Sequence, residues 1–146
     1  MNEVAGLSKK RSSLIDTGFL YAILDKSDAR HEMCVAALEN EPDRLLPEVV
    51  LPELAYLVLR QSNYSGLSRF LRSIAAGEFE LVKTEIPDLE RAAEILEKYA
   101  DSKIDFVDAV IMAIAERLNI ERILTVDRRD FGLFRPRHCD HFEIVP

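Results

Sequence analysis

The sequence has no tryptophan and only two cysteines among its 146 residues. Cys34 and Cys139 lie far apart, without the short paired spacing that a zinc site or a redox motif requires. The cysteines therefore indicate no metal or redox function. Their sparse, unpaired use favours a reducing, cytoplasmic setting.

Long apolar runs are also absent. No uninterrupted stretch reaches the roughly 18 to 20 residues that cross a bilayer, and the longest ones contain an acid. We expect a soluble protein without a membrane partner. Because single cores usually hold about 100 to 150 residues, we expect one domain over residues 1–146.

We expect no export signal in the first residues. Asp16 interrupts the apolar segment that begins at Leu14, before a signal-peptide core of about 7 to 15 residues can form. Residues 1–11 end in Lys9, Lys10 and Arg11. This segment is predicted to be a flexible basic leader to the first strand.

Basic residues are fewer than acidic ones, with 19 lysines and arginines against 26 acids, which gives a net charge of −7. Such a balance ordinarily argues against nucleic acid, because phosphate binding depends on clustered cations. Whether nucleic acid can bind therefore depends on where the charges lie in the sequence. The positions of the acids are more informative about function than those of the basic residues.

Hydrophobic periodicity predicts strands that alternate with helices. The expected strands cover residues 13–15, 44–46, 79–82, 122–126 and 142–145, and the expected helices cover 18–24, 28–37, 48–60, 66–76, 87–99 and 106–118. Alternation of this kind predicts an α/β domain with a mainly parallel sheet, since parallel neighbours need crossover helices.

Four acids occupy positions that acids normally avoid. The helices over 48–60 and 106–118 are apolar on nearly every side, which predicts that Glu53 and Asp108 are buried with them. Asp16 and Asp127 each follow an apolar strand and should meet at the carboxyl edge of the sheet, where open α/β folds bind ligands. We therefore expect the four acids to converge.

A buried cluster of carboxylates repels itself unless a cation compensates it. Hard oxygen ligands select Mg²⁺ or Mn²⁺, and the lack of accompanying histidine or cysteine disfavours zinc. Each acid also has a structural interpretation that the sequence leaves open. These are a helix cap at Asp16, a satisfied acid at Glu53, a cap at Asp105 with Asp108 in the first turn, and a charged turn at Asp127 and Asp130.

Two other classes of protein share part of the pattern. The string Asp16-Thr17-Gly18 matches the aspartic-protease signature, but that chemistry needs two such loops in an all-β fold. A receiver domain would need an acidic pair at the first strand and a late lysine, and neither is apparent. Both classes fit less well than a metal-dependent site.

Three segments together resemble the PIN-domain family, and within it the VapC-type toxins of toxin–antitoxin pairs. They are Leu-Ile-Asp-Thr at 14–17, Asp-Phe-Val-Asp-Ala at 105–109 and Thr-Val-Asp-Arg-Arg-Asp-Phe at 125–131. The resemblance extends from residue 14 to 146. It implies a three-layer α/β/α fold with a central, mainly parallel sheet of four to five strands.

The resemblance also implies a function. It implies an endoribonuclease that hydrolyses RNA phosphodiester bonds with Mg²⁺ or Mn²⁺, acts as a homodimer and is inhibited by a small antitoxin protein. The implied catalytic metal ligands are Asp16, Glu53, Asp108 and Asp127, with support from Thr125, Asp130 and Asp105. Asp130 matches a position that either supports the site or adds a fifth acid.

Gly18 departs from the family pattern, which often has Ser or Asn there, and Glu53 is assigned by its place in a helix. RNA must approach an acidic pocket, so basic residues should rim it; Arg128, Arg129 and Arg11 are the candidates. A solubilising surface explains any one arginine equally well. The alternative function is a catalytically silent PIN-like module that only binds a partner protein.

Overall fold

The computed structural model describes residues 12–146. The predicted basic leader and Arg11 lie outside the described residues. Among residues 12–146 no helix is long and apolar enough to cross a membrane.

A sheet of five parallel strands forms the middle of the fold, in the order β3-β2-β1-β4-β5. This result confirms the predicted α/β class and the upper of the two expected strand numbers. The strands are β1 (Ser12–Ile15), β2 (Asp43–Pro47), β3 (Glu80–Val82), β4 (Arg122–Leu124) and β5 (Glu143–Val145).

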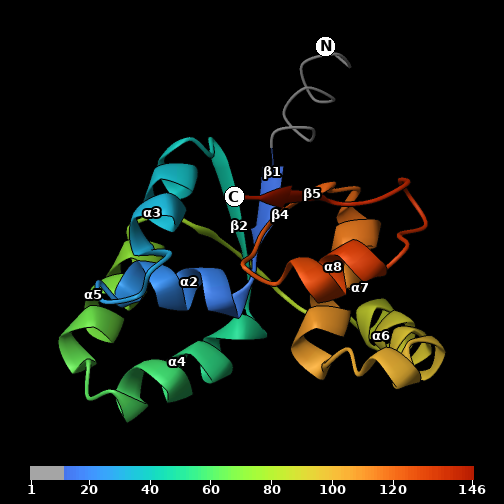
Figure 1. Cartoon of the computed structure of the whole chain (residues 1–146), viewed down its shortest axis with the longest axis horizontal. Coiled ribbons are helices and arrows are strands. Elements are labelled where there is room, and N and C mark those ends of the chain that lie inside the picture. Colours follow the sequence, from blue (N-terminus) through green and yellow to red (C-terminus); the bar gives the residue numbers. More distant parts are fainter. Residues whose placement is uncertain (1–11) are drawn as a thin grey trace.

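Helices cover both faces of the sheet, which gives the expected three layers (Figure 1). One layer holds α2 (Thr17–Leu24), α3 (His31–Glu39), α4 (Val50–Arg60) and α5 (Tyr64–Ala75). The other holds α6 (Ile86–Lys98), α7 (Phe106–Leu118) and α8 (Arg128–Leu133), with a 3₁₀ turn at Ala100–Ser102 between α6 and α7. The change of face follows from the topology, because a right-handed crossover that reverses direction along the sheet must use its opposite side.

The core lies between β1 and the helices on either side. All four residues of β1 are buried, with Leu14 and Ile15 fully covered. In α7 every residue from Asp108 to Ala115 is buried. The prediction of an all-round apolar, buried helix is therefore confirmed for α7, and Asp108 is buried with it.

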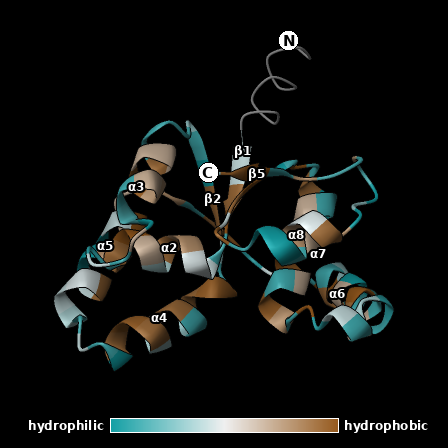
Figure 2. Cartoon of the chain, in the orientation of Figure 1, coloured by the Kyte–Doolittle hydropathy of each residue, from teal (hydrophilic) through white to brown (hydrophobic). Residues whose placement is uncertain are grey.

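The same prediction is wrong for α4. Only Val50, Leu54 and Val58, which form one stripe at fourfold spacing, are buried. Glu53 is exposed, and Tyr56 is 65% exposed. The helix packs on α2 and α5 from outside, and no described element covers its other face, although much of it is hydrophobic (Figure 2). Apolar residues thus surround Glu53 in the sequence without burying it.

Strand order changes direction at β1. The chain moves from β1 through β2 to β3 on one side, then returns to place β4 on the other side of β1. Ligands of open α/β folds bind at the carboxyl edge beside such a switch point. Asp16 follows β1 directly, and Asp127 follows β4 after two intervening residues.

Candidate active site

Asp16 forms the first part of the site, at the junction of β1 and α2. It is the N-cap of α2, and its carboxylate accepts hydrogen bonds from the Thr17 backbone nitrogen at 2.7 Å and the Thr125 hydroxyl at 2.8 Å. The residue is 5% exposed. The capping interpretation is confirmed, but a cap alone explains neither the burial nor the second bond, which comes from the segment that follows β4.

Thr125 joins the ends of β1 and β4. Its Oγ1 donates to Asp16 Oδ2 and accepts from the Asp127 backbone nitrogen at 2.9 Å. The Asp16 backbone nitrogen also donates to the Leu124 carbonyl at 2.9 Å, so the hydrogen bonding between the two chain segments continues one residue beyond the end of β1. One buried hydroxyl thereby fixes the two sequence-distant segments that carry Asp16 and Asp127.

The other acids come in two pairs, each at the start of a helix. Asp105 is the N-cap of α7 and accepts from the Asp108 backbone nitrogen at 2.9 Å. Asp127 is the N-cap of α8 and accepts from the Asp130 backbone nitrogen at 3.0 Å. In both pairs the acid three residues into the helix is buried. The expected turn at 127–130 is therefore the start of a short helix.

Asp108, Asp127 and Asp130 each present a carboxylate oxygen, and these three atoms lie within 4.8 Å of one another. The negative charge of Asp127 also acts on Asp16, and that of Asp16 acts on Asp108. We refer to Asp16, Asp108, Asp127 and Asp130 as the carboxylate cluster. The start of α2 and the segment leading into α8 lie side by side at the carboxyl end of β1 (Figure 1).

Burial and mutual repulsion raise the pKa of three members of the cluster. Burial, followed by the charge of Asp16, raises the pKa of Asp108 to about 10. Burial raises the pKa of Asp16 only to about 6, because the bonds from Thr125 and Thr17 stabilise its ionised form. Burial and the charge of Asp127 raise the pKa of Asp130. Without a cation the cluster thus retains protons near neutral pH.

Glu53 stands apart from the cluster. It is exposed on α4 and is not among the three acids with converging oxygens. Its negative charge nevertheless makes a small contribution to the raised pKa of Asp16, after burial and the charge of Asp127. The structure therefore brings Asp108 and Asp127 together with Asp130, links Asp16 to them through Thr125, and leaves Glu53 at the rim.

The donor set suits a hard divalent cation. Carboxylate oxygens are the ligands that Mg²⁺ and Mn²⁺ prefer, and a bound positive charge would offset the burial and the repulsion that raise the pKa of Asp108. Among the described residues no histidine or cysteine joins the cluster, so the chemistry of zinc fits less well.

The two candidate arginines within the described residues point to different partners. Arg129 Nη1 lies 2.6 Å from Asp130 Oδ1, and its Nη2 donates to the Ser102 carbonyl at 2.9 Å. Arg128 instead donates to the Pro146 carbonyl. Only Arg129 is therefore paired directly with the carboxylate cluster.

The sequence comparison decides the family, because a model of the PIN domain matches residues 13–134. The chain belongs to the PIN-domain family. This PIN domain is 33% identical over 134 residues to Ribonuclease VapC26 of Mycobacterium tuberculosis, covering 91% of this chain and 99% of that protein. The resemblance seen in the three sequence segments is confirmed.

Solved structures share the fold. The Mycobacterium tuberculosis toxin VapC20, described as cleaving the Sarcin-Ricin loop, has a TM-score of 0.77 at 21% identity, with coverage of 88% of this chain and 98% of that chain. A toxin–antitoxin complex from Klebsiella pneumoniae gives a TM-score of 0.63 at 22% identity, covering 84% and 92%. At these identities the matches establish the PIN fold alone.

The sequence resemblance assigns Asp130 to a supporting position or to that of a fifth acid, and the structure places its carboxylate beside those of Asp108 and Asp127. The missed signal is the repeated spacing Asp-x-x-Asp, at 105–108 and again at 127–130. A capping acid followed three residues later by another acid is a helix-start pattern. This pattern would have predicted α8 of the PIN domain and the inward position of its second acid.

Proposed function

We propose that this PIN domain is a metal-dependent endoribonuclease that hydrolyses RNA phosphodiester bonds. The observation that carries the proposal is the cluster of four acids at the switch point of the sheet, in which Asp16, Asp108 and Asp130 are buried and Asp127 is half-buried, with the pKa of Asp108 raised to about 10. Such an arrangement is costly unless it binds a cation, which is the reason to assign it a function. The similarity to Ribonuclease VapC26 supports RNA as the substrate.

Asp108, Asp127 and Asp130 are the residues best placed to hold Mg²⁺ or Mn²⁺, with Asp16 beside them and Glu53 at the rim. When bound, a divalent cation supplies an activated water and stabilises charge on the phosphate. The catalytic and metal-binding assignment of Asp16, Glu53, Asp108 and Asp127 is thereby extended to Asp130.

The protein side of the reaction is mainly positioning. The Thr125 hydroxyl and the Thr17 amide hold the Asp16 carboxylate in one orientation and favour its ionised form. The caps at Asp105 and Asp127 hold the starts of α7 and α8. Preorganised groups of this kind need little rearrangement during reaction, and no side-chain nucleophile is required.

We further propose that the protein is the toxin of a toxin–antitoxin pair and forms homodimers. The structural neighbour from Klebsiella pneumoniae is described as a toxin–antitoxin complex, which supports a protein partner. Large apolar side chains are exposed on α3, α4 and α5, and partner proteins that cover them would account for this exposure. They are Met33 on α3, Tyr56 on α4, and Tyr64 and Leu71 on α5.

The test is cleavage of a mixed cellular RNA pool by purified protein with Mg²⁺, with Mn²⁺ and with chelator. We expect cleavage only with metal, and none from Asp16→Asn. Asp140→Asn is the matched control, because it removes an exposed acid outside the cluster and should leave cleavage intact.

The alternative, a catalytically silent module, gives a different pattern. It predicts no cleavage with either metal, together with Mg²⁺ affinity too weak to detect by calorimetry. Metal binding without cleavage of the pool would instead require a highly selective RNA, to be sought with defined tRNA and ribosomal RNA substrates.

A further inference from the structure

Arg129 differs from its neighbour in a way that bears on the reaction. Among residues 12–146, it alone forms an ion pair with a member of the carboxylate cluster, through Asp130. Its second anchor, the Ser102 carbonyl, lies on the turn between α6 and α7. The guanidinium is therefore held at the edge of the cluster from two directions.

The anchored guanidinium still has donors to offer. A guanidinium carries five N–H groups, and the two anchors occupy one on each terminal nitrogen. The Arg129 side chain is 66% exposed, so its remaining donors are open to solvent. Asp130, in contrast, is 11% exposed and lies beneath it.

The charge balance makes such a donor useful. A phosphate that approaches four clustered carboxylates is an anion among anions, so its position depends on the cations at the site. Arginine binds phosphate oxygens with a planar pair of donors, and its charge does not titrate in the range where the acids do.

We propose that Arg129 is a catalytic phosphate clamp, whose free guanidinium donors bind the scissile phosphate of the substrate. The proposal rests on the nuclease function above and deepens it. The hydrogen bonds to Asp130 and to the Ser102 carbonyl hold the Arg129 guanidinium at the cluster before substrate binds. Arg128 donates to the Pro146 carbonyl instead and does not share this position. The proposal therefore gives Arg129 a role that Arg128 does not have, although the sequence alone does not distinguish the two.

The experiment compares Arg129→Ala, Arg129→Lys and Arg128→Ala with the wild-type chain. Removing a preorganised donor to developing charge typically costs about 100- to 1000-fold in kcat, which is the loss expected for Arg129→Ala. Arg129→Lys should recover part of the rate, because it restores the charge but not the fork. Arg128→Ala removes the same charge one position away, so the ratio of the two alanine variants isolates the effect of position.

A second measurement does not depend on cleavage. Calorimetry with inorganic phosphate in the presence of Mg²⁺ should show affinity reduced by at least about tenfold in Arg129→Ala relative to Arg128→Ala, as expected for a charge-assisted hydrogen bond. Mg²⁺ affinity itself should be unchanged or higher in Arg129→Ala, since a neighbouring positive charge is lost. Circular dichroism should show that all variants fold.

Two results would overturn the clamp. One is equal loss of kcat and of phosphate affinity in both alanine variants, which would make Arg129 an ordinary surface cation. The other is a large loss of Mg²⁺ affinity in Arg129→Ala, which would make it a positioning residue for Asp130. If wild-type protein cleaves neither the RNA pool nor the defined tRNA and ribosomal RNA substrates, the nuclease proposal fails, and the phosphate measurement still decides the clamp.

Discussion

Among single residues, Thr125 connects two parts of the site through one hydroxyl group. It donates to the Asp16 carboxylate and accepts from the Asp127 amide. Thr125→Val keeps the shape but leaves both partners unsatisfied, which should lower the free energy of unfolding by about 1 to 3 kcal/mol. The pKa of Asp16 should rise further, because the hydroxyl bond lowers it.

The matched control is Thr125→Ser, which retains the hydroxyl and should retain most of the stability. Urea unfolding gives the stability difference, and carboxyl NMR titration gives the pKa of Asp16. A valine variant as stable as wild type, with an unchanged Asp16 titration, would contradict the linking role assigned to Thr125.

Asp108 predicts how the stability of the metal-free protein changes with pH. Its pKa is about 10 in the folded chain against an ordinary 3.8, so between these values the folded state binds the extra proton. The contribution of Asp108 to stability is therefore greatest below about pH 4 and falls as pH rises toward 10. Asp108→Asn cannot ionise, and at pH 8 it should be more stable than the metal-free wild type by at least about 1 kcal/mol.

The measurement is urea unfolding in chelator at several pH values between 4 and 9. The asparagine variant should show a flatter profile, because one of the groups that disfavours folding at high pH is gone. A wild-type profile that instead rises steadily from pH 5 to 9 would show that Asp108 is ionised without metal.

At the scale of elements, α7 and α4 show what the sequence can and cannot predict. Both are rich in apolar residues, and the sequence predicts burial for both. In α7 the prediction holds, because the helix lies between the sheet, α6 and α8. In α4 it fails for Glu53, because apolar composition does not say whether the covering surface belongs to the same chain.

The residues of the candidate site likewise divide into those that the sequence could place and those that it could not. Asp16 and Asp127 could be placed from strand ends, because parallel strands bring their carboxyl ends to one edge of the sheet. The position of Asp130 could not, because α8 was not predicted. The different partners of Arg128 and Arg129 depend on side-chain directions that spacing alone does not fix.

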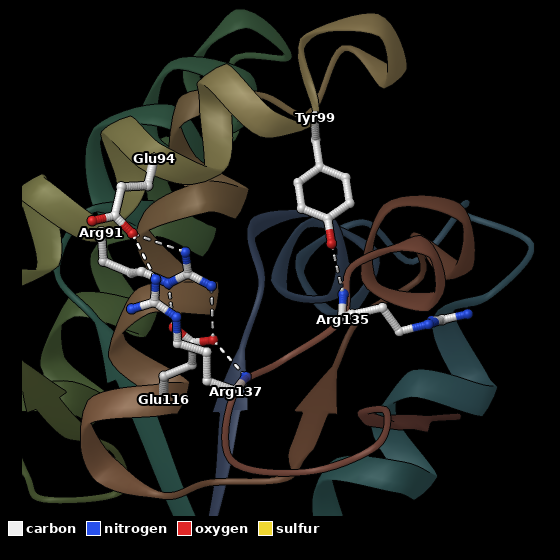
Figure 3. Close-up of polar contacts among 6 residues, drawn as sticks. All are labelled: Arg91, Glu94, Tyr99, Glu116, Arg135 and Arg137. Carbon is white, nitrogen blue, oxygen red and sulfur yellow. Dashed lines mark hydrogen bonds and ion pairs between the residues drawn. The ribbon is translucent and has the colours of Figure 1, made fainter.

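A network of charged side chains holds the segment after α8 against α6 and α7. Arg91 donates to both carboxylate oxygens of Glu116, at 2.6 and 3.1 Å, and the Arg137 backbone nitrogen donates to Glu116 as well, at 2.8 Å. Figure 3 shows Arg91 and Arg137 converging on Glu94 and Glu116. Glu116 is thus the residue on which the segment depends.

Glu116→Ala should therefore destabilise the fold more than Arg137→Ala does. Arg91 is 15% exposed and would lose its main partner, at an expected cost of about 1 to 3 kcal/mol. The Arg137 side chain is 65% exposed, and its pair with Glu94 should contribute less than about 1 kcal/mol. Thermal unfolding of the two variants checks the order, and equal destabilisation would assign the anchoring to the exposed pair instead.

At the scale of the whole molecule, the net charge of −7 misleads about function unless its placement is known. Acids concentrated at one edge of the sheet repel one another in the metal-free protein, and the fold tolerates them because part of the charge is neutralised by protons. A divalent cation would replace those protons. Metal binding should therefore stabilise the chain and release protons together.

Saturating Mg²⁺ at about 100 times its Kd should raise the free energy of unfolding by about 2.7 kcal/mol. At pH 7 the binding should release protons, detected by calorimetry in buffers of different ionisation enthalpy, and affinity should increase from pH 6 to 8 as protons on the cluster compete less. Asp108→Asn should lose both the stabilisation and most of the proton release. Metal binding without proton release would mean that the cluster is already ionised in the free protein, and that the repulsion among its carboxylates is relieved by some other means.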